Sequence, residues 1–150
     1  MIGSATDTTD RATLNWLTGT GVGAWIPPTA IYLALLTANP ATTAAVPTDP
    51  QLSELQELSA TGYSRQAVVW NNATTPIGGQ SVIVNSNNVS FGPFTSANGS
   101  GSPATFGALV TTSSGTTGEV IYTFQWSQPL LAAQNTPILV SAGAISLYQQ

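Results

Sequence analysis

The feature that most constrains the fold is a succession of short apolar and β-branched runs, separated by turn residues, that fills the chain from residue 64 onward. Runs of this length, bounded by residues that tolerate positive φ, are typical of antiparallel strands joined by tight turns. The predicted strands are residues 64–70, 80–85, 89–91, 104–112, 119–126, 138–141 and 144–148, and the turns include Gly78-Gly79, Asn87-Asn88, Asn98-Gly99, Ser114-Gly115 and Ala142-Gly143. In residues 119–126 alternate side chains are apolar, which is the two-residue period of a strand and predicts a core-facing element.

The N-terminal part adds one helix and one further strand. Residues 7–17 predict a short helix, with Asp7 and Asp10 as capping carboxylates. Residues 30–37 form a run that is apolar on both faces, so we expect a strand covered from both sides. The pattern predicts a mainly β chain, a jelly-roll-like antiparallel β-sandwich with a short N-terminal helix. Its parts are residues 1–28, the helix and lead-in, and residues 29–150, the sandwich.

Residues 39–62 form a long arm between the first two predicted strands of the sandwich. Loops of this length in compact domains are usually functional or become ordered on contact. Within the arm, Leu52, Leu55 and Leu58 recur at three-residue spacing after Asp49-Pro50, which predicts a helical turn. The leucines either dock on a partner or close the domain's own core, and periodicity alone does not separate the two. The arm's length and low charge motivate the hypothesis that it orders mainly against another chain.

Charged residues are scarce, at 5% of the chain against roughly 25% in typical soluble domains. The two cations are Arg11 and Arg65, and there is no lysine, whereas neutralising phosphates requires several cations in one patch. Nucleic acid is therefore not an expected partner. Because little charge keeps copies apart, we expect contacts with other proteins and a homo-oligomer.

The sequence offers few groups for catalysis. It contains no histidine and no cysteine, which removes the commonest general base, thiol nucleophiles and the commonest zinc ligands. The carboxylate pairs Asp7 with Asp10 and Glu54 with Glu57 are more typical of caps and solvated residues than of an acid and base. We expect no catalytic, cofactor-binding or metal-binding residue. Without a signal-peptide pattern or an apolar run of roughly 18 residues, we also expect synthesis in a cytoplasm and no membrane partner.

Several motifs resemble those of a family of small tailed-phage virion proteins often described as tail-fibre-like. The segment Gly62-Tyr63-Ser64-Arg65-Gln66 is similar to that family's Gly-Tyr-x-Arg-Gln motif, and residues 29–40 resemble its first strand and Thr-Ala-x-Pro turn. Further segments follow in the family's order and approximate spacing: Val89-Ser90-Phe91, Phe106-Gly107-Ala108 and Ala142-Gly143-Ala144-Ile145. The resemblance implies a non-enzymatic structural protein of the virion that is made in the host bacterial cytoplasm. It would bind other virion proteins, either the major capsid protein or tail proteins.

Two positions in the virion are compatible with this resemblance. A fibre needs length from repeats, coiled coil or a β-helical shaft, and the sequence contains none, which favours a compact capsid decoration or cement subunit. For a decoration subunit we expect a trimer, because capsid lattices offer threefold positions. The alternative is a tail-fibre, tail-tip or baseplate attachment subunit. Such a subunit could carry a carbohydrate receptor-binding surface, because Trp16, Trp25, Trp70 and Trp126 could stack on sugars, although most aromatic area fills cores and interfaces.

Arg65 lies on a predicted strand close to Tyr63 and needs a partner. We expect backbone carbonyls or a carboxylate such as Glu57 of the same subunit to satisfy it, in preference to a bridge between subunits, because buried polar groups are usually paired locally. The candidate interface residues are Leu52, Leu55, Leu58, Tyr63, Arg65, Trp16 and Trp25.

Overall fold

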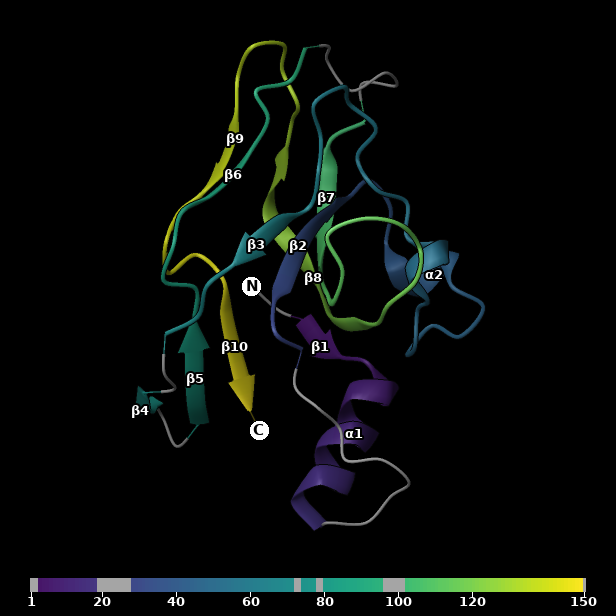
Figure 1. Cartoon of the computed structure of the whole chain (residues 1–150), viewed down its shortest axis with the longest axis vertical. Helices are drawn as coiled ribbons and strands as arrows, with labels where there is room; N and C mark the ends of the chain where they lie inside the picture. Colours follow the sequence, from purple (N-terminus) through teal and green to yellow (C-terminus); the bar gives the residue numbers. More distant parts are fainter. Residues whose placement is uncertain (1–2, 19–27, 72–73, 78–79, 96–101, 150) are drawn as a thin grey trace.

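The computed structural model describes residues 3–18, 28–71, 74–77, 80–95 and 102–149, which form a mainly β chain with antiparallel sheets and a short N-terminal helix (Figure 1). This confirms the predicted fold class. The elements are β1 (Gly3–Ala5), α1 (Asp7–Thr18), β2 (Ile31–Leu36), α2 (Pro40–Thr43), the 3-10 turn η1 (Leu52–Glu54), β3 (Gln66–Val68), β4 (Thr74–Ile77), β5 (Gln80–Val84), β6 (Val89–Phe91), β7 (Ala104–Val110), β8 (Val120–Leu130), β9 (Ile138–Val140) and β10 (Ser146–Gln149).

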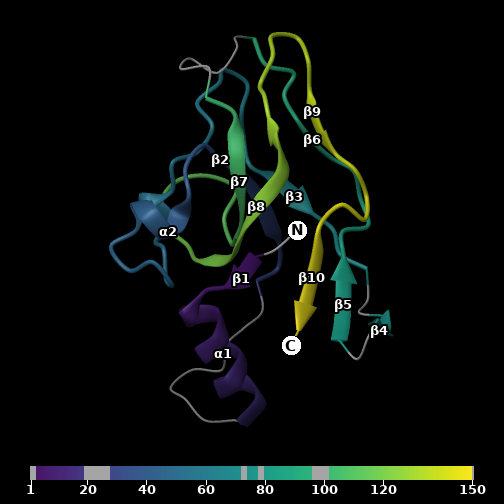
Figure 2. The same cartoon turned by 180° about the vertical axis from the view of Figure 1, so that it is seen from behind.

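The described strands form one main sheet and two smaller ones. The main sheet has the order β1-β8-β7-β2-β3, the second β10-β5-β4, and the third is the ribbon β6-β9. Figures 1 and 2 place α2 and the β6-β9 ribbon on opposite sides of the main sheet. The arrangement is sandwich-like, whereas a jelly roll pairs eight strands in two sheets. The jelly-roll part of the prediction is therefore not confirmed.

Strand β2 is covered on both faces, as its sequence predicts. Its side chains alternate, so Leu33 and Leu35 enter the larger core, which includes Phe91 of the β6-β9 ribbon. Ala34 and Leu36 face the other way and join a second cluster. Residues of the arm, β7 and β8 complete this second cluster: Leu52, Ala108, Val110 and Val120. The main sheet therefore lies between two apolar layers supplied by the same chain.

The arm at residues 39–62 packs on its own domain. Leu52 is 3% exposed in the second cluster, Leu58 is 2% exposed in the larger core, and Leu55 packs partly buried beside Leu52. The backbone also joins the sheet, because the Leu58 N–H donates to the Leu35 carbonyl at 2.8 Å. This packing favours the alternative in which the leucines close the domain's own core over the hypothesis that they order against another chain. The second apolar face of β2 needs a cover, and the arm provides it.

The arm contains two short helical segments. The predicted turn near the leucines exists as η1, but Gln51 precedes it as the cap, where the sequence suggested Asp49-Pro50. The second segment, α2, begins at Pro40, and the Asn39 side chain accepts a hydrogen bond from the Ala41 N–H at 3.1 Å. Both follow the rule that proline or a polar cap stands at the start of a helix.

Helix α1 matches the predicted helix but begins differently. Its cap is Thr6, whose Oγ1 accepts from the Thr9 N–H at 3.3 Å and donates to the Val120 carbonyl at 2.8 Å. Asp7 and Asp10 occupy the first turn instead. Residues 3–5, for which the sequence predicted no strand, form β1 and pair with β8, which joins the N-terminal part to the main sheet. Strand β4 was also not predicted; it contains Pro76 and lies at a sheet edge, where proline is tolerated.

Candidate interaction site

The Gly-Tyr-x-Arg-Gln motif places Arg65 in a network of hydrogen bonds within the domain. The Arg65 residue is 9% exposed, and its guanidinium group faces the Glu57 carboxylate, with Nε 3.1 Å from Oε1 and 3.2 Å from Oε2. Nη2 also donates to Glu57 Oε1 and to the Gly115 carbonyl at 2.9 Å, while Nη1 donates to the Thr112 carbonyl at 3.2 Å. The prediction of partners within the same subunit is confirmed.

Tyr63 extends the same network into the core. Its hydroxyl donates to Glu57 Oε2 at 2.8 Å and accepts from the Leu35 N–H at 3.0 Å. Its ring stacks on Phe91, with ring centroids 6.0 Å apart. Burial, followed by the neighbouring Glu57 carboxylate, raises the pKa of Tyr63 far above its ordinary value. The neutral phenol therefore ties the end of the arm to β2.

The glycine of the motif also has a structural reason. Gly62 has a φ of +96°, and a Cβ at this position would lie 2.7 Å from the Pro93 carbonyl oxygen. Any other residue would meet both backbone strain and a steric clash. The motif therefore specifies a local structure, in which the Tyr63 hydroxyl and the Arg65 guanidinium group bind partners within the domain.

The predicted interface residues do not form one exposed site. Leu52, Leu58 and Arg65 are buried inside the domain, and Leu55 and Tyr63 are half-buried. Trp25 and the side chain of Trp16 lie outside the described residues. The other two tryptophans, Trp70 and Trp126, are half-buried and pack against the larger core, and Trp126 Nε1 donates to the Phe106 carbonyl at 3.0 Å. These two side chains fill the edge of the core and do not form an exposed surface on which a sugar could stack.

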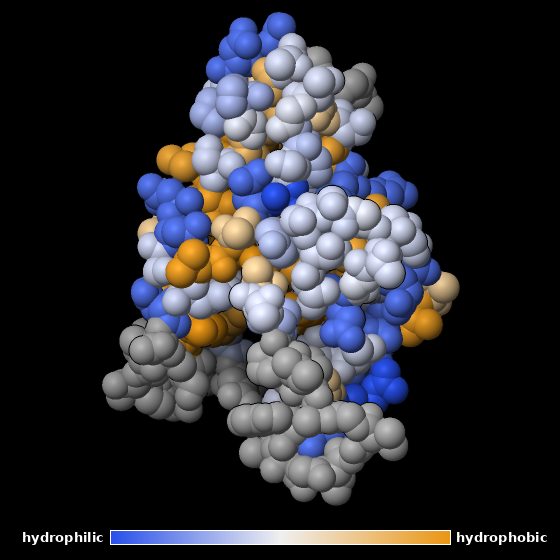
Figure 3. Space-filling view, in the orientation of Figure 1, coloured by the Kyte–Doolittle hydropathy of each residue, from blue (hydrophilic) through white to orange (hydrophobic). Residues whose placement is uncertain are grey.

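The surface of the sandwich is almost free of charge. From residue 66 to residue 150 the sequence has a single charged side chain, Glu119. In Figure 3, patches of apolar residues lie between pale, weakly polar ones on one face of the molecule. The large apolar residues that the described part of the chain exposes are Leu14, Val46, Val69, Leu131, Leu139 and Tyr148. Such a surface presents little electrostatic barrier to association with protein.

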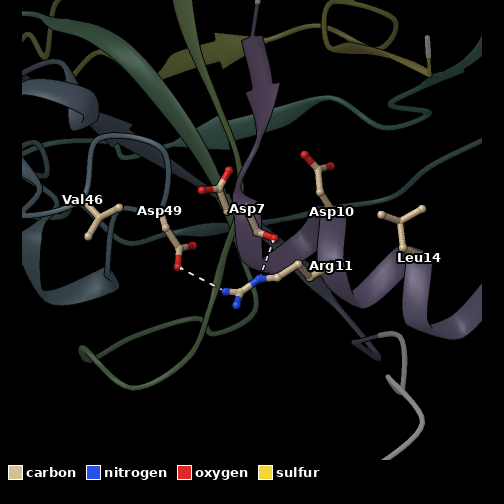
Figure 4. Close-up of a pocket in the computed structure, with 6 residues that line it drawn as sticks. All are labelled: Asp7, Asp10, Arg11, Leu14, Val46 and Asp49. Carbon is tan, nitrogen blue, oxygen red and sulfur yellow. Dashed lines mark hydrogen bonds and ion pairs between the residues drawn. The ribbon is translucent and has the colours of Figure 1, made fainter. Parts of the chain in front are cut away.

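The charges that remain are concentrated between α1 and the arm. A pocket of about 440 Å³ lies there, and Figure 4 shows its lining: Asp7, Asp10, Arg11 and Leu14 from α1, with Val46 and Asp49 from the arm. Three carboxylates line it, yet among the described residues no group of three acidic side chains is arranged to hold a metal ion. Sequence reasoning missed this pocket because its two walls are far apart in the chain.

None of the helices in the described segments is long and apolar enough to cross a membrane.

This small antiparallel β domain forms the bonds of Tyr63 and Arg65 within itself, and its surface is nearly uncharged. These are properties of a structural subunit that contacts other proteins. The family model described as "Podophage GP4 fiber I protein gp80" matches residues 4–148, nearly the whole chain. The chain belongs to this family and is a structural, tail-fibre-type protein of a bacteriophage virion. The match supports the fibre alternative better than the capsid decoration subunit that the sequence favoured. No curated protein matches the chain.

Proposed function

We propose that this chain is a non-enzymatic subunit of a podophage tail fibre and acts there by binding other virion proteins. The observation that carries the proposal is the match to the fibre family over residues 4–148, which includes the main sheet, the arm and the motif network. A capsid position is favoured only by the compact form of the chain and by its lack of a repeated shaft. Compactness describes one domain and carries no information about which part of the particle the domain occupies.

Two observations support the absence of catalysis. The sequence supplies neither histidine nor cysteine, so a general base or nucleophile would have to come from six carboxylates, four tyrosines, and serines or threonines without a histidine partner. The most buried ionisable cluster, Glu57 with Tyr63 and Arg65, spends its hydrogen bonds on the protein itself. This cluster behaves as a structural support and not as a reacting centre.

Self-association is part of the proposal. The exposed Val69 and Leu139 support contact between copies, because strands β3, β6 and β9 beside them carry no charged side chain that would repel another copy. The trimer stays a prediction, because neither the fold nor the family match gives the number of copies. Native mass spectrometry of the purified chain gives the number of copies directly, and a monomer alone at micromolar concentration would count against self-association.

A carbohydrate-binding surface is not favoured by the described residues, because Trp70 and Trp126 pack against the core. The fibre position itself can be tested by fractionation. Particles of the phage that encodes this chain are dissociated gently, tails are separated from capsids, and the chain is quantified by mass spectrometry in each fraction. We expect it with the tails; recovery with the capsids alone would overturn the proposal.

A further inference from the structure

The pocket between α1 and residues 44–50 is a firmly built feature of the domain. The Asp7 N–H donates to the Thr48 carbonyl at 3.1 Å, and Thr48 Oγ1 donates back to Asp7 Oδ2 at 2.8 Å. Thr8 Oγ1 donates to Asp49 Oδ2 at 2.9 Å. These three bonds fix the helix to the arm, so the relative position of the pocket walls is set before any partner arrives.

The pocket carries excess negative charge. Asp7, Asp10 and Asp49 bring three carboxylates, and Arg11 brings one guanidinium group, which gives a formal charge of 1 − 3 = −2. The partly positive N-terminus of α1, roughly half a charge, offsets only part of this excess. Arg11 is already engaged, since its Nε donates to the Asp7 carbonyl at 3.3 Å and its Nη2 lies 4.0 Å from Asp49 Oδ2.

The rim of the pocket is apolar on both sides. Leu14 of α1 is 59% exposed and Val46 of the arm is 52% exposed, and both line the pocket beside the carboxylates (Figure 4). A side chain that matches this combination has an aliphatic stem and a cationic end, as lysine and arginine do. The stem would cover Leu14 or Val46 while the cation meets the carboxylates.

Apart from Arg11, this chain has no available lysine or arginine side chain that could enter the pocket of another copy. It has no lysine, and the side chain of Arg65 is 6% exposed and paired with Glu57. A second copy could bring only its own Arg11, which already contacts Asp7 and Asp49 in the same pocket. Charge complementarity therefore selects a different protein as the occupant.

We propose that the pocket between α1 and residues 44–50 receives a lysine or arginine side chain of a different virion protein and so docks this subunit in the particle. The inference rests on the proposed function, because it assumes that the chain is incorporated into the virion. It goes further by naming the docking surface and the chemistry of the partner.

The first test is charge reversal at Asp10. Within the described part of the chain the Asp10 carboxylate makes no hydrogen bond or ion pair, so Asp10→Lys should leave the contacts between α1 and the arm intact. A phage lacking the gene is complemented with each variant, and copies per particle are measured by quantitative mass spectrometry. We expect Asp10→Lys to lower incorporation by about tenfold, because like charges across an interface strongly disfavour binding. The matched control, Glu119→Lys, makes the same change at an exposed position elsewhere and should incorporate normally.

A second pair of variants tests the apolar rim without changing charge. Leu14→Gln should also reduce incorporation, while Leu131→Gln, at a leucine that is equally exposed, should not. Normal incorporation of both Asp10→Lys and Leu14→Gln would overturn the inference. Absence of the wild-type chain from particles would instead refute the proposed function, so the two failures are distinguishable.

Carbodiimide coupling of intact particles identifies the occupant. The reagent joins carboxylates to lysines, and because this chain has no lysine, any amide from Asp7, Asp10 or Asp49 to a lysine must reach a different protein. Such a cross-link supports the inference. A cross-link to the N-terminal amine of another copy, with no lysine coupled, would contradict it. If incorporation falls without a cross-link, the basic residue is an arginine, which the reagent does not couple.

Discussion

The substitution Leu58→Ala tests whether the arm belongs to the core of its own domain. The Leu58 side chain is 2% exposed in the larger core, and the backbone hydrogen bond from residue 58 to the Leu35 carbonyl is kept by alanine. The loss is therefore that of the side chain alone, about 2–5 kcal/mol for a buried leucine. In a domain of this size each kcal/mol lowers Tm by about 2–4 °C, so Tm should fall by about 4–20 °C.

The assay is thermal unfolding of the purified full chain, followed by circular dichroism. Leu131→Ala makes the same chemical change at a leucine that is 58% exposed, and we expect it to alter stability by no more than about 0.5 kcal/mol. If Leu58→Ala left Tm unchanged and instead removed the chain from particles, residues 39–62 would be a contact arm after all. The packing described for the arm would then be refuted.

Three other substitutions test the motif network and the packing of the main sheet. Glu57→Gln should destabilise the domain by about 3 kcal/mol in urea, because it leaves the guanidinium group of Arg65 without a counter-charge; an unchanged midpoint would contradict this. The raised pKa of Tyr63 predicts that stability is fully present below pH about 10, the ordinary tyrosine value, and declines above it. In Tyr63→Phe the loss of stability with rising pH should be smaller, and a pH profile identical to that of the wild type would contradict the raised pKa of Tyr63. Gly107→Ala should cost about 1–3 kcal/mol, because its Cβ would lie 2.5 Å from the Phe124 ring, and a variant as stable as the wild type would disprove that contact.

Local patterns predicted the strands well where one principle dominated. The alternation of residues 119–126 and the double-sided run of residues 30–37 correspond to β8 and β2, and the Arg65 partners followed from the need to satisfy a buried cation. Strand β1 was missed because Gly3-Ser4-Ala5 has no apolar period, and its pairing depends on the open edge of β8.

The role of the arm could not be predicted because three-residue spacing indicates a common face and says nothing about what covers it. Leu52 and Leu58 even enter different apolar layers. The helical turn η1 ends between them, and the chain then runs beside β2, where the Leu58 N–H binds the Leu35 carbonyl. The pocket at α1 was beyond sequence reasoning for a related reason. Asp10 and Asp49 become neighbours only when the arm folds back onto the helix.

The central claim is that this chain is a fibre subunit of the tail, and immunogold electron microscopy of intact particles tests it most directly. An antibody raised against the purified chain is applied to wild-type particles and to particles lacking the gene, which control for nonspecific labelling. We expect gold only at the tail and its fibres in the wild type, and none in the mutant. Gold distributed over the capsid surface, with none at the tail, would contradict the fibre assignment and restore the decoration subunit.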